Sequence, residues 1–554
     1  MERKPSRLTE RAFDVVIVGG GVTGAALAWD AALRGLSVAL LEKGDFGEAT
    51  SAASSKLIHG GIRYLQQGQL GKVRESLEER RRFLRVAPHL LTPVPFLVPT
   101  YGHGLKGKEI LALGMSVYEA LGAGLARDLP GARRLDRFRL LSRDDVLSRE
   151  PIVRAEGLTG AAVFPEIHMH SSERMTLALV QAAVAAGAEA ANYVQATGFL
   201  GEPDRVTGVR AHDLLSDEEF EVRGRLVLNA AGPWAYRFLE RAGRVRPPGT
   251  MQHSKGCHVV LPSLTNGHAL ALATRLENEA LLNRGGRHIF LIPWRGHTLV
   301  GTTNVPFRGE PDDVSVTDRD VDDFLAEIRS AIPGADLRRD RVVFAFSGLY
   351  PLVDTEVREK VYQGSGEYRV VDHREADRVD GLVTVLGAKF TTALRLAEKT
   401  IDGVFARDGR RAPPCRTGDV PVPGGDVESR AAAAAAIAKA APALAADEVE
   451  ELAATHGGLG VDIARRIGDD AALARRIGPE RPVVRAAVQV AAESEMAMRL
   501  ADLVFRRTGL GTLGHPGAAC LADCAAILGG VHGWTAERRE REIREVEATL
   551  GHAR

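Results

Sequence analysis

The sequence predicts an α/β fold in which a Rossmann-like nucleotide-binding domain is interleaved with a mixed or antiparallel β-sheet domain, followed by an all-helical C-terminal domain. Three observations predict it. A β-branched run near the N-terminus ends in a glycine-rich turn, short alternating apolar segments fill residues 250–350, and nearly every segment after residue 426 has helical periodicity.

The nucleotide-binding unit begins with a strand over Phe13–Val18, whose continuous apolar run is typical of a parallel strand buried on both faces. A helix is expected over 25–34 and a second strand over 37–41. The turn between the first strand and the helix reads G-x-G-x-x-G, and Glu42 directly follows the second strand. This order of strand, turn, helix and strand indicates a dinucleotide site, without distinguishing NAD from FAD.

Each position of this fingerprint has a physical task. Gly19 permits the tight turn, Gly21 lets backbone amides approach a pyrophosphate, and Gly24 allows close packing of the helix. Glu42 can accept hydrogen bonds from a ribose, and the helix N-terminus supplies partial positive charge.

The remaining elements are predicted from shorter patterns. Helices are expected over 75–85, which is strongly basic, over 171–190 and from Thr391. Strands are expected over 192–194, 225–229 and 382–386, and a small hairpin over 206–210 and 219–222.

The domain organisation follows from these elements. Residues 1–411 are expected to form the oxidoreductase part, with nucleotide-binding segments at roughly 12–85, 171–235 and 340–405 and substrate-binding segments at roughly 86–170 and 236–339. Residues 412–426 are a predicted linker, since residues 412–425 hold four prolines and three glycines. Residues 427–554 are expected to form the separate helical domain.

Composition argues against several classes of protein. Lys plus Arg and Asp plus Glu each total 72, so the formal net charge is zero and no nucleic-acid partner is expected. No run of ~18 apolar residues predicts a membrane span, and the charged N-terminus does not resemble a secretory signal. The four cysteines favour a reduced compartment without a disulfide framework or metal site, and Cys520 and Cys524 are expected to be buried hydrophobes.

One segment points to a family. Residues 54–65 read SSKLIHGGIRYL, which resembles the most characteristic motif of the FAD-dependent glycerol-3-phosphate dehydrogenases of the aerobic, membrane-associated type. Further family landmarks follow in order at residues 87–90, 229–234, 254–258, 293–294, 301–303 and 387–392. Residues 495–508 look like part of that family's C-terminal domain, so the resemblance covers nearly the whole chain.

The resemblance implies FAD as cofactor and a phosphorylated polyol as substrate. The implied reaction oxidises sn-glycerol 3-phosphate to dihydroxyacetone phosphate by hydride transfer to flavin N5, with electrons passed to a quinone. Residues expected to hold FAD are Gly19, Gly21, Val22, Thr23, Gly24, Glu42, Lys43, Ser51, Ser54, Ser55, Lys56, His59, Val194, Ala230, Gly232, Trp234, Gly387, Lys389, Phe390 and Thr391.

Three residues are expected to be catalytic: His59, Arg63 and Lys389. The imidazole of His59 suits a base for the hydroxyl proton, and the guanidinium of Arg63 suits the substrate phosphate. Four residues apart, they are expected to share a helix face or a tight turn. By resemblance, Tyr64 and His258 also line the substrate pocket, and Lys389 lies near the flavin.

Two departures from the family pattern leave the substrate open. Tyr350 and Gly366 stand where the family commonly has arginines expected to bind the substrate phosphate, so Tyr350 becomes the expected substrate contact. One alternative is a flavoenzyme on the same scaffold that oxidises a different polyol phosphate or a less charged hydroxy compound. Another is a flavin-binding homologue without turnover.

The sequence gives less information about the electron acceptor, the cellular location and the oligomeric state. Either a quinone or O2 can accept the electrons, and no residue pattern separates the two. The resemblance implies a cytoplasmic protein with peripheral contact to the inner face of the cell membrane, for which the basic helix at 75–85 is a candidate. The helical tail is a candidate surface for a homodimer.

Overall fold

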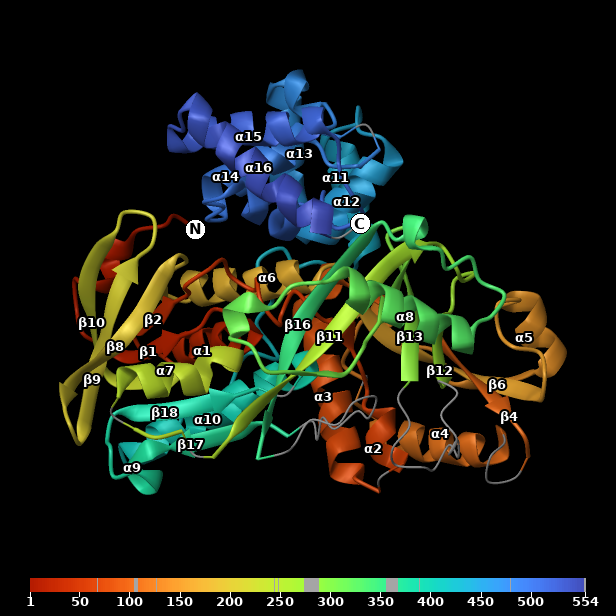
Figure 1. Ribbon diagram of the computed structural model, residues 1–554, viewed down its shortest axis with the longest axis horizontal. Helices are drawn as coiled ribbons and strands as arrows, with labels where there is room; N and C mark the ends of the chain where they lie inside the picture. Colours follow the sequence, from red (N-terminus) through yellow and green to blue (C-terminus); the bar gives the residue numbers. More distant parts are fainter. Residues whose placement is uncertain are drawn as a thin grey trace.

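The computed structural model describes residues 1–66, 68–103, 108–125, 127–243, 245–247, 249–273, 288–354, 367–387, 389–478 and 480–552. Two sheets lie side by side in a broad lower body, and the C-terminal helices form a second body above them (Figure 1). This arrangement confirms the predicted fold class.

The first sheet is parallel at its centre. Its strands, in spatial order, are β17 (Arg369–Asp372), β18 (Leu382–Leu386), β10 (Glu218–Asn229), β1 (Phe13–Val18), β2 (Val38–Leu41) and β7 (Glu189–Ala191). The antiparallel strands β8 (Val194–Glu202) and β9 (Arg205–Asp213) extend it by pairing with the first half of β10. Since β1 is buried among parallel neighbours, its continuous apolar sequence is explained.

The second sheet is mainly antiparallel. Its strands are β3 (Leu57–Ile58), β4 (Leu91–Tyr101), β5 (Arg139–Ser142), β6 (Leu158–Met169), β11 (Met251–Pro262), β12 (Ala269–Ala273), β13 (His288–Trp294), β14 (His297–Gly301), β15 (Val305–Phe307) and β16 (Phe344–Val353). The long pairing of β11 with β16 places residues 254 and 350 directly opposite each other.

Helices cover both sheets. They are α1 (Val22–Leu33), α2 (Ile62–Gln66), α3 (Leu70–Val86), α4 (Lys108–Gly122), α5 (Arg143–Arg149), α6 (Ser172–Ala185), α7 (Ala235–Ala242), α8 (Asp318–Ala331), α9 (His373–Ala376) and α10 (Ala393–Arg407). Helix α1 packs against α6 and α10 and is almost entirely buried, which its alanine-rich sequence permits.

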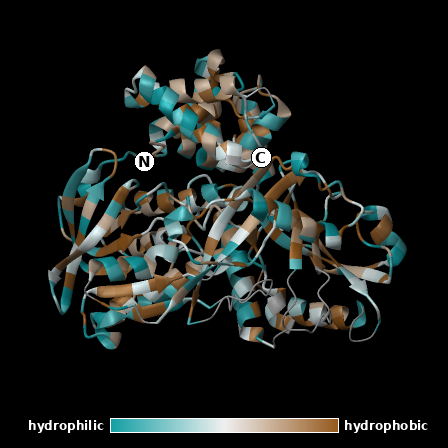
Figure 2. Ribbon diagram, viewed as in Figure 1, coloured by the Kyte–Doolittle hydropathy of each residue, from teal (hydrophilic) through white to brown (hydrophobic). Residues whose placement is uncertain are grey.

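The C-terminal domain consists of α11 (Arg430–Ala440), α12 (Ala446–His456), α13 (Gly460–Asp469), α14 (Arg485–Ser494), a π-helix (Asp502–Arg507), α15 (Ala518–His532) and α16 (Ala536–His552). Cys520 and Cys524 are free and buried in α15, as expected. Hydrophilic and hydrophobic segments are mixed along the helices of this domain, and strongly hydrophobic segments are frequent in the strands below (Figure 2). Within the described residues, no helix is long and apolar enough to cross a bilayer.

Several sequence predictions differ from the structure. The helix expected over 171–190 ends at Ala185, because the chain turns at Gly187 with φ +100°. The strand expected over 192–194 is instead the junction between β7 and β8, where Tyr193 has φ +56°. Residues 219–222 and 225–229 form one continuous strand, β10, and not two.

Two further expectations concern whole segments. Residues 340–405, expected on the nucleotide side, contribute β16 to the second sheet because it pairs along its length with β11. The expected basic helix is α3, but its arginines pair with protein carboxylates: Arg80 with Glu166, and Arg81 with Asp128. These pairs remove much of the free positive charge that would attract a lipid surface.

Candidate active site

A cavity of about 1540 Å³ lies between the two sheets. Its walls come from the carboxyl ends of β1, β2 and β10, from the segment after β18, and from β11 and β16. Ligands of open α/β sheets bind outside the carboxyl ends of parallel strands. The cavity therefore lies where the fold places a nucleotide.

The glycine turn between β1 and α1 forms one end of the cavity. Gly19 has φ +107°, and a Cβ there would lie 2.6 Å from the carbonyl oxygen of Ala230. A Cβ at Gly24 would overlap the carbonyl oxygen of Gly19. Both positions require glycine, so the turn can bring its backbone amides and the N-terminus of α1 against an anion.

Glu42 fixes this turn from the neighbouring strand. Its carboxylate accepts hydrogen bonds from the backbone N–H of Gly20 at 2.6 Å and of Gly44 at 2.7 Å. Burial raises the pKa of Glu42 to about 6, against the effect of these two donors. Beside it, the Lys43 ammonium lies 4.1 Å from the ring centre of Trp234, which closes the outer side of this end.

His59 lies at the other end of the cavity, in the loop between β3 and α2. Burial, together with the nearby positive charges of Lys389 and Arg80, lowers its pKa to about 3. The imidazole is therefore neutral and keeps a ring-nitrogen lone pair, but its lowered pKa makes it a weaker base than a free imidazole. Of the two arrangements expected for His59 and Arg63, the shared helix face is excluded, because α2 begins only at Ile62, and the chain instead turns at Gly61 with φ +75°.

Lys389 brings a cation close to His59. Its ammonium donates to the Ser76 hydroxyl at 3.1 Å and lies 4.4 Å from the ring centre of Tyr64. Burial lowers the pKa of Lys389 to about 8. A lysine held this way stays mostly protonated at neutral pH but loses its charge more readily than an exposed one.

His258 lines the same end from β11. One of its ring nitrogens, Nε2, lies 3.0 Å from the Ser55 hydroxyl, and its ring stacks on Phe346 with centres 4.9 Å apart and planes 9° apart. Burial, then the charge of Lys56, lowers the pKa of His258 to about 3. Phe346 comes from β16, so the pairing of β11 with β16 builds this contact.

Sequence reasoning missed a buried charge cluster beneath His59. The Glu166 carboxylate accepts from the backbone N–H of Gly60 at 2.8 Å and from Arg80 at 3.3 Å, and Arg80 also donates to the Tyr118 hydroxyl at 3.1 Å. Burial raises the pKa of Glu166. An acidic residue inside the apolar strand sequence VFPEIHM was the available signal.

Comparison with known proteins places the chain. Residues 14–402 match the FAD dependent oxidoreductase family, and residues 415–539 match the C-terminal domain of alpha-glycerophosphate oxidase. A glycerol-3-phosphate dehydrogenase from Synechocystis is 33% identical over 96% of this chain and 95% of its own length. The chain belongs to the FAD-dependent glycerol-3-phosphate dehydrogenase family.

Other members support the assignment. The aerobic glycerol-3-phosphate dehydrogenase of Bacillus subtilis is 31% identical over 92% of this chain and 89% of its own. The solved structure of the glycerol-3-phosphate dehydrogenase from Bacillus halodurans, complexed with FAD, has a TM-score of 0.76 and 26% identity, covering 99% and 96% of the two chains. The chain is thus an FAD-dependent oxidoreductase, as its motifs predict.

The residues of this family member fit the cofactor. Three residues that line the cavity each carry a buried polar atom with no hydrogen-bond partner among the described residues: Trp234 at Nε1, Thr391 at Oγ1 and His258 at Nδ1. Buried polar groups are almost always satisfied. These unpaired groups beside the cavity, and the turn at Gly19 and Gly24 that excludes any Cβ, suit the polar groups and the pyrophosphate of FAD.

The predicted site residues gather around this one cavity. It is lined by Gly19, Gly21, Val22, Thr23, Glu42, Lys43, Ser51, Ser54, Ser55, Lys56, His59, Tyr64, Val194, Ala230, Gly232, Trp234, His258, Tyr350, Gly387, Lys389, Phe390 and Thr391. Gly24 lies behind the turn, where it packs against the backbone of Gly19. The Lys56 ammonium is held by the Glu173 carboxylate at 2.8 Å, in a buried pair. The side chain of Arg63 and residue Gly366 lie outside the described residues.

Proposed function

We propose that the chain oxidises sn-glycerol 3-phosphate to dihydroxyacetone phosphate and passes the electrons to a quinone. The observation that carries this proposal is that a neutral His59 imidazole and the Lys389 ammonium line the same cavity as the nucleotide cradle, near enough for the charge of Lys389 to act on His59. A base and a cation at one point suit a secondary alcohol that carries a phosphate.

Bound FAD supplies a hydride acceptor at N5. The chain's own residues do the rest. A ring nitrogen of His59 takes the hydroxyl proton, and the Lys389 ammonium, with Arg63 by resemblance, holds the phosphate dianion. Tyr64 and His258 close the pocket around the carbon skeleton, and Phe346 behind His258 helps to exclude water.

Anaerobic titration of the purified holoenzyme with glycerol 3-phosphate tests the reaction. The expected result is loss of the oxidised-flavin absorbance, with an endpoint near one substrate per flavin, whereas glycerol without the phosphate leaves the absorbance unchanged. No bleaching at about millimolar substrate would reject the proposal, since millimolar is the upper range of ordinary KM values.

Tyr350 favours a second candidate. Its side chain lines the cavity at a position where the resembled family commonly has an arginine, so one expected phosphate contact is missing. The candidate is oxidation of a different polyol phosphate or a less charged hydroxy compound by the same machinery. A panel of such compounds, ranked by the rate of flavin reduction, separates the two. A holoenzyme that none of them reduces would indicate a homologue without turnover.

The apolar residues that α4 contributes to the cavity support the quinone. They are Ile110, Leu111, Leu113 and Val117, and Leu113 is also 62% exposed to solvent. Apolar side chains that are shared between a cavity and the surface suit an isoprenoid tail and a lipid surface. We infer that this side of the protein rests on the cytoplasmic face of the membrane.

Replacing Leu113 by Glu tests this inference. Turnover with a membrane quinone and co-sedimentation with vesicles should both fall, while turnover with a small water-soluble dye should not. Glu in place of Leu459, an exposed hydrophobic residue of the C-terminal domain that does not line the cavity, is the matched control. Equal quinone activity in the two variants, or stoichiometric H2O2 production by the wild type in air, would contradict the quinone assignment.

A further inference from the structure

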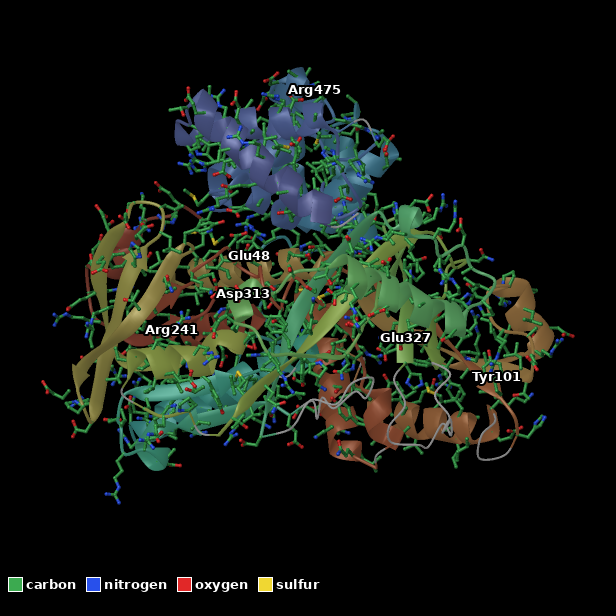
Figure 3. The ribbon with its side chains drawn as sticks, in the orientation of Figure 1. Glu48, Tyr101, Arg241, Asp313, Glu327 and Arg475 are labelled. Carbon is green, nitrogen blue, oxygen red and sulfur yellow. The ribbon has the colours of Figure 1, made fainter. Side chains whose placement is uncertain are left out.

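The turn after β2, residues 42–48, lies between the cofactor cavity and the C-terminal domain. Six of its residues line the cavity: Glu42, Lys43, Gly44, Asp45, Gly47 and Glu48. Glu42 holds the glycine turn on the inner side. Glu48 lies on the side of the lower body that faces the C-terminal helices (Figure 3). Contacts that the C-terminal domain makes with this turn can therefore affect the shape of the cofactor cavity.

Asp45 makes the contact across the domain boundary. Its Oδ2 accepts from Nη1 of Arg507 at 2.6 Å and from Nε of Arg506 at 2.6 Å, and its Oδ1 accepts from Nη2 of Arg507 at 2.7 Å. Asn192 adds a fourth donor at 3.0 Å. Asp45 and Arg507 are each 1% exposed or less, so this is a fork-to-carboxylate pair sealed from water.

Both arginines are themselves fixed. They are consecutive residues at the end of the π-helix, a rare element that often occurs at functional sites. Arg506 also donates to Asp502 at 2.6 Å, and Asp502 accepts from the Tyr193 hydroxyl at 2.6 Å. Arg507 donates from Nε to the backbone oxygen of Glu495 at 3.0 Å. The arginines therefore present a rigid surface to Asp45.

The charges on the two sides match. Burial alone would raise the pKa of Asp45, but the guanidinium groups of Arg507 and Arg506 lower it to about 2, so Asp45 stays ionised. A buried, ionised carboxylate has no water to solvate it and is stabilised only by its partners. Removing one partner therefore destabilises the fold by much more than the intact ion pair stabilises it.

We propose that Arg506 and Arg507 are positioning residues for the FAD site, which hold the 42–48 turn from the C-terminal domain and so couple retention of the cofactor to docking of that domain. The coupling is reciprocal: if docking of the C-terminal domain strengthens FAD binding, then bound FAD strengthens docking by the same factor. The proposal does not depend on the substrate oxidised, and no step of its test uses a substrate.

Asp45→Asn in the full-length holoenzyme tests the coupling. The rate of FAD release is followed by the rise in free-flavin fluorescence after dilution. We expect release about tenfold faster or more, within the usual range of coupling between sites. The matched control is Glu495→Gln, because Glu495 binds Arg174 at 2.5 Å across the same boundary and neither residue lines the cavity. Arg475→Gln, at the far end of the helical domain, is a surface control (Figure 3).

A second measurement separates positioning from general destabilisation. Excess FAD should raise the melting temperature of the wild type and of Glu495→Gln equally, but that of Asp45→Asn by clearly less. Should Asp45→Asn fail to fold, Arg507→Lys, which keeps the charge but loses the fork, should release FAD faster by several-fold. Release rates within twofold of wild type in every folded variant of Asp45 and Arg507, or equal losses in the Glu495 control, would overturn the proposal.

Discussion

The two ends of the cavity are built in different ways. The nucleotide end comes mainly from one stretch of chain, residues 19–48, and works through glycines, backbone amides and the end of a helix. The substrate end takes His59, Glu166, His258 and Lys389 from separate segments and works through side chains. At the end built from backbone, the glycines cannot be replaced by residues with side chains. At the end built from side chains, a single replacement can alter which substrate fits.

The largest effect is expected at the nucleotide end. Gly24→Val would place side-chain atoms on the carbonyl oxygen of Gly19 and displace α1 from the turn. Overpacking of this kind costs about 3 kcal/mol or more, which is over a hundredfold in affinity. The flavin content of the purified variant should be close to zero. Gly198→Ala, at a glycine with open space, should keep full flavin content.

His59→Asn should come next, and it should spare the cofactor. Loss of a general base lowers rates by about 10²–10⁴-fold. The rate constant for anaerobic flavin reduction, measured in a stopped-flow instrument, should fall by that factor while flavin content stays normal. His212→Asn, at a partly exposed histidine paired with Asp217 that does not line the cavity, is the control. A reduction rate within threefold of wild type would remove His59 from the role of base.

Tyr350→Arg sharpens the question of substrate. If the substrate is glycerol 3-phosphate, a new charge-assisted contact should tighten its binding by about tenfold or more, since such contacts contribute about 1.5–3 kcal/mol. The dissociation constant is read from the anaerobic flavin titration, with Tyr350→Phe as control. Weaker binding in the arginine variant would instead favour the less charged substrate.

The smallest effect is a pH dependence. Because the pKa of Lys389 is lowered to about 8, its ammonium loses the proton as the pH rises through that value, and its attraction for a phosphate disappears. The KM for glycerol 3-phosphate should rise about threefold to fourfold between pH 7 and 8.5. In Lys389→Arg the rise should vanish, because arginine stays charged. An unchanged profile in this variant would show that another group titrates.

The same contrast explains what the sequence could predict. The glycine fingerprint and Glu42 were readable because their spacing is local and each position has a fixed task. The contact of His258 with Ser55, 203 residues earlier, and its stacking on Phe346 depend on strand pairing that no local pattern reveals. His59 was found only through a family motif. Its neighbour Glu166 was marked by an acidic residue within an apolar strand sequence, but that signal does not say which loop the carboxylate binds.

The junction at Asp45 was hidden for a further reason. Asp45 and Arg507 are 462 residues apart. In addition, the chain turns between β7 and β8 at Tyr193, which has a positive φ although it is not a glycine, so the sequence gives no sign of the turn. The sequence predicted a strand there because Tyr193 and Val194 are residue types that favour strands. The structure instead bends at Tyr193, and the buried amide of Asn192 donates long-range hydrogen bonds to Asp45 and to the backbone oxygen of Met496, which no local propensity reveals.

The order of strands in the first sheet also determines when, during synthesis, the cofactor cavity can be completed. Strands β1 and β2 lie within the first 41 residues, but their neighbours β10 and β18 end at Asn229 and Leu386, and the arginines that hold the 42–48 turn follow at 506 and 507. During synthesis the glycine turn therefore emerges long before the walls of its cavity exist. The walls of the cavity are complete only after residue 391, and the contact that we propose to hold the 42–48 turn forms only after residue 507, so FAD is expected to bind late in synthesis.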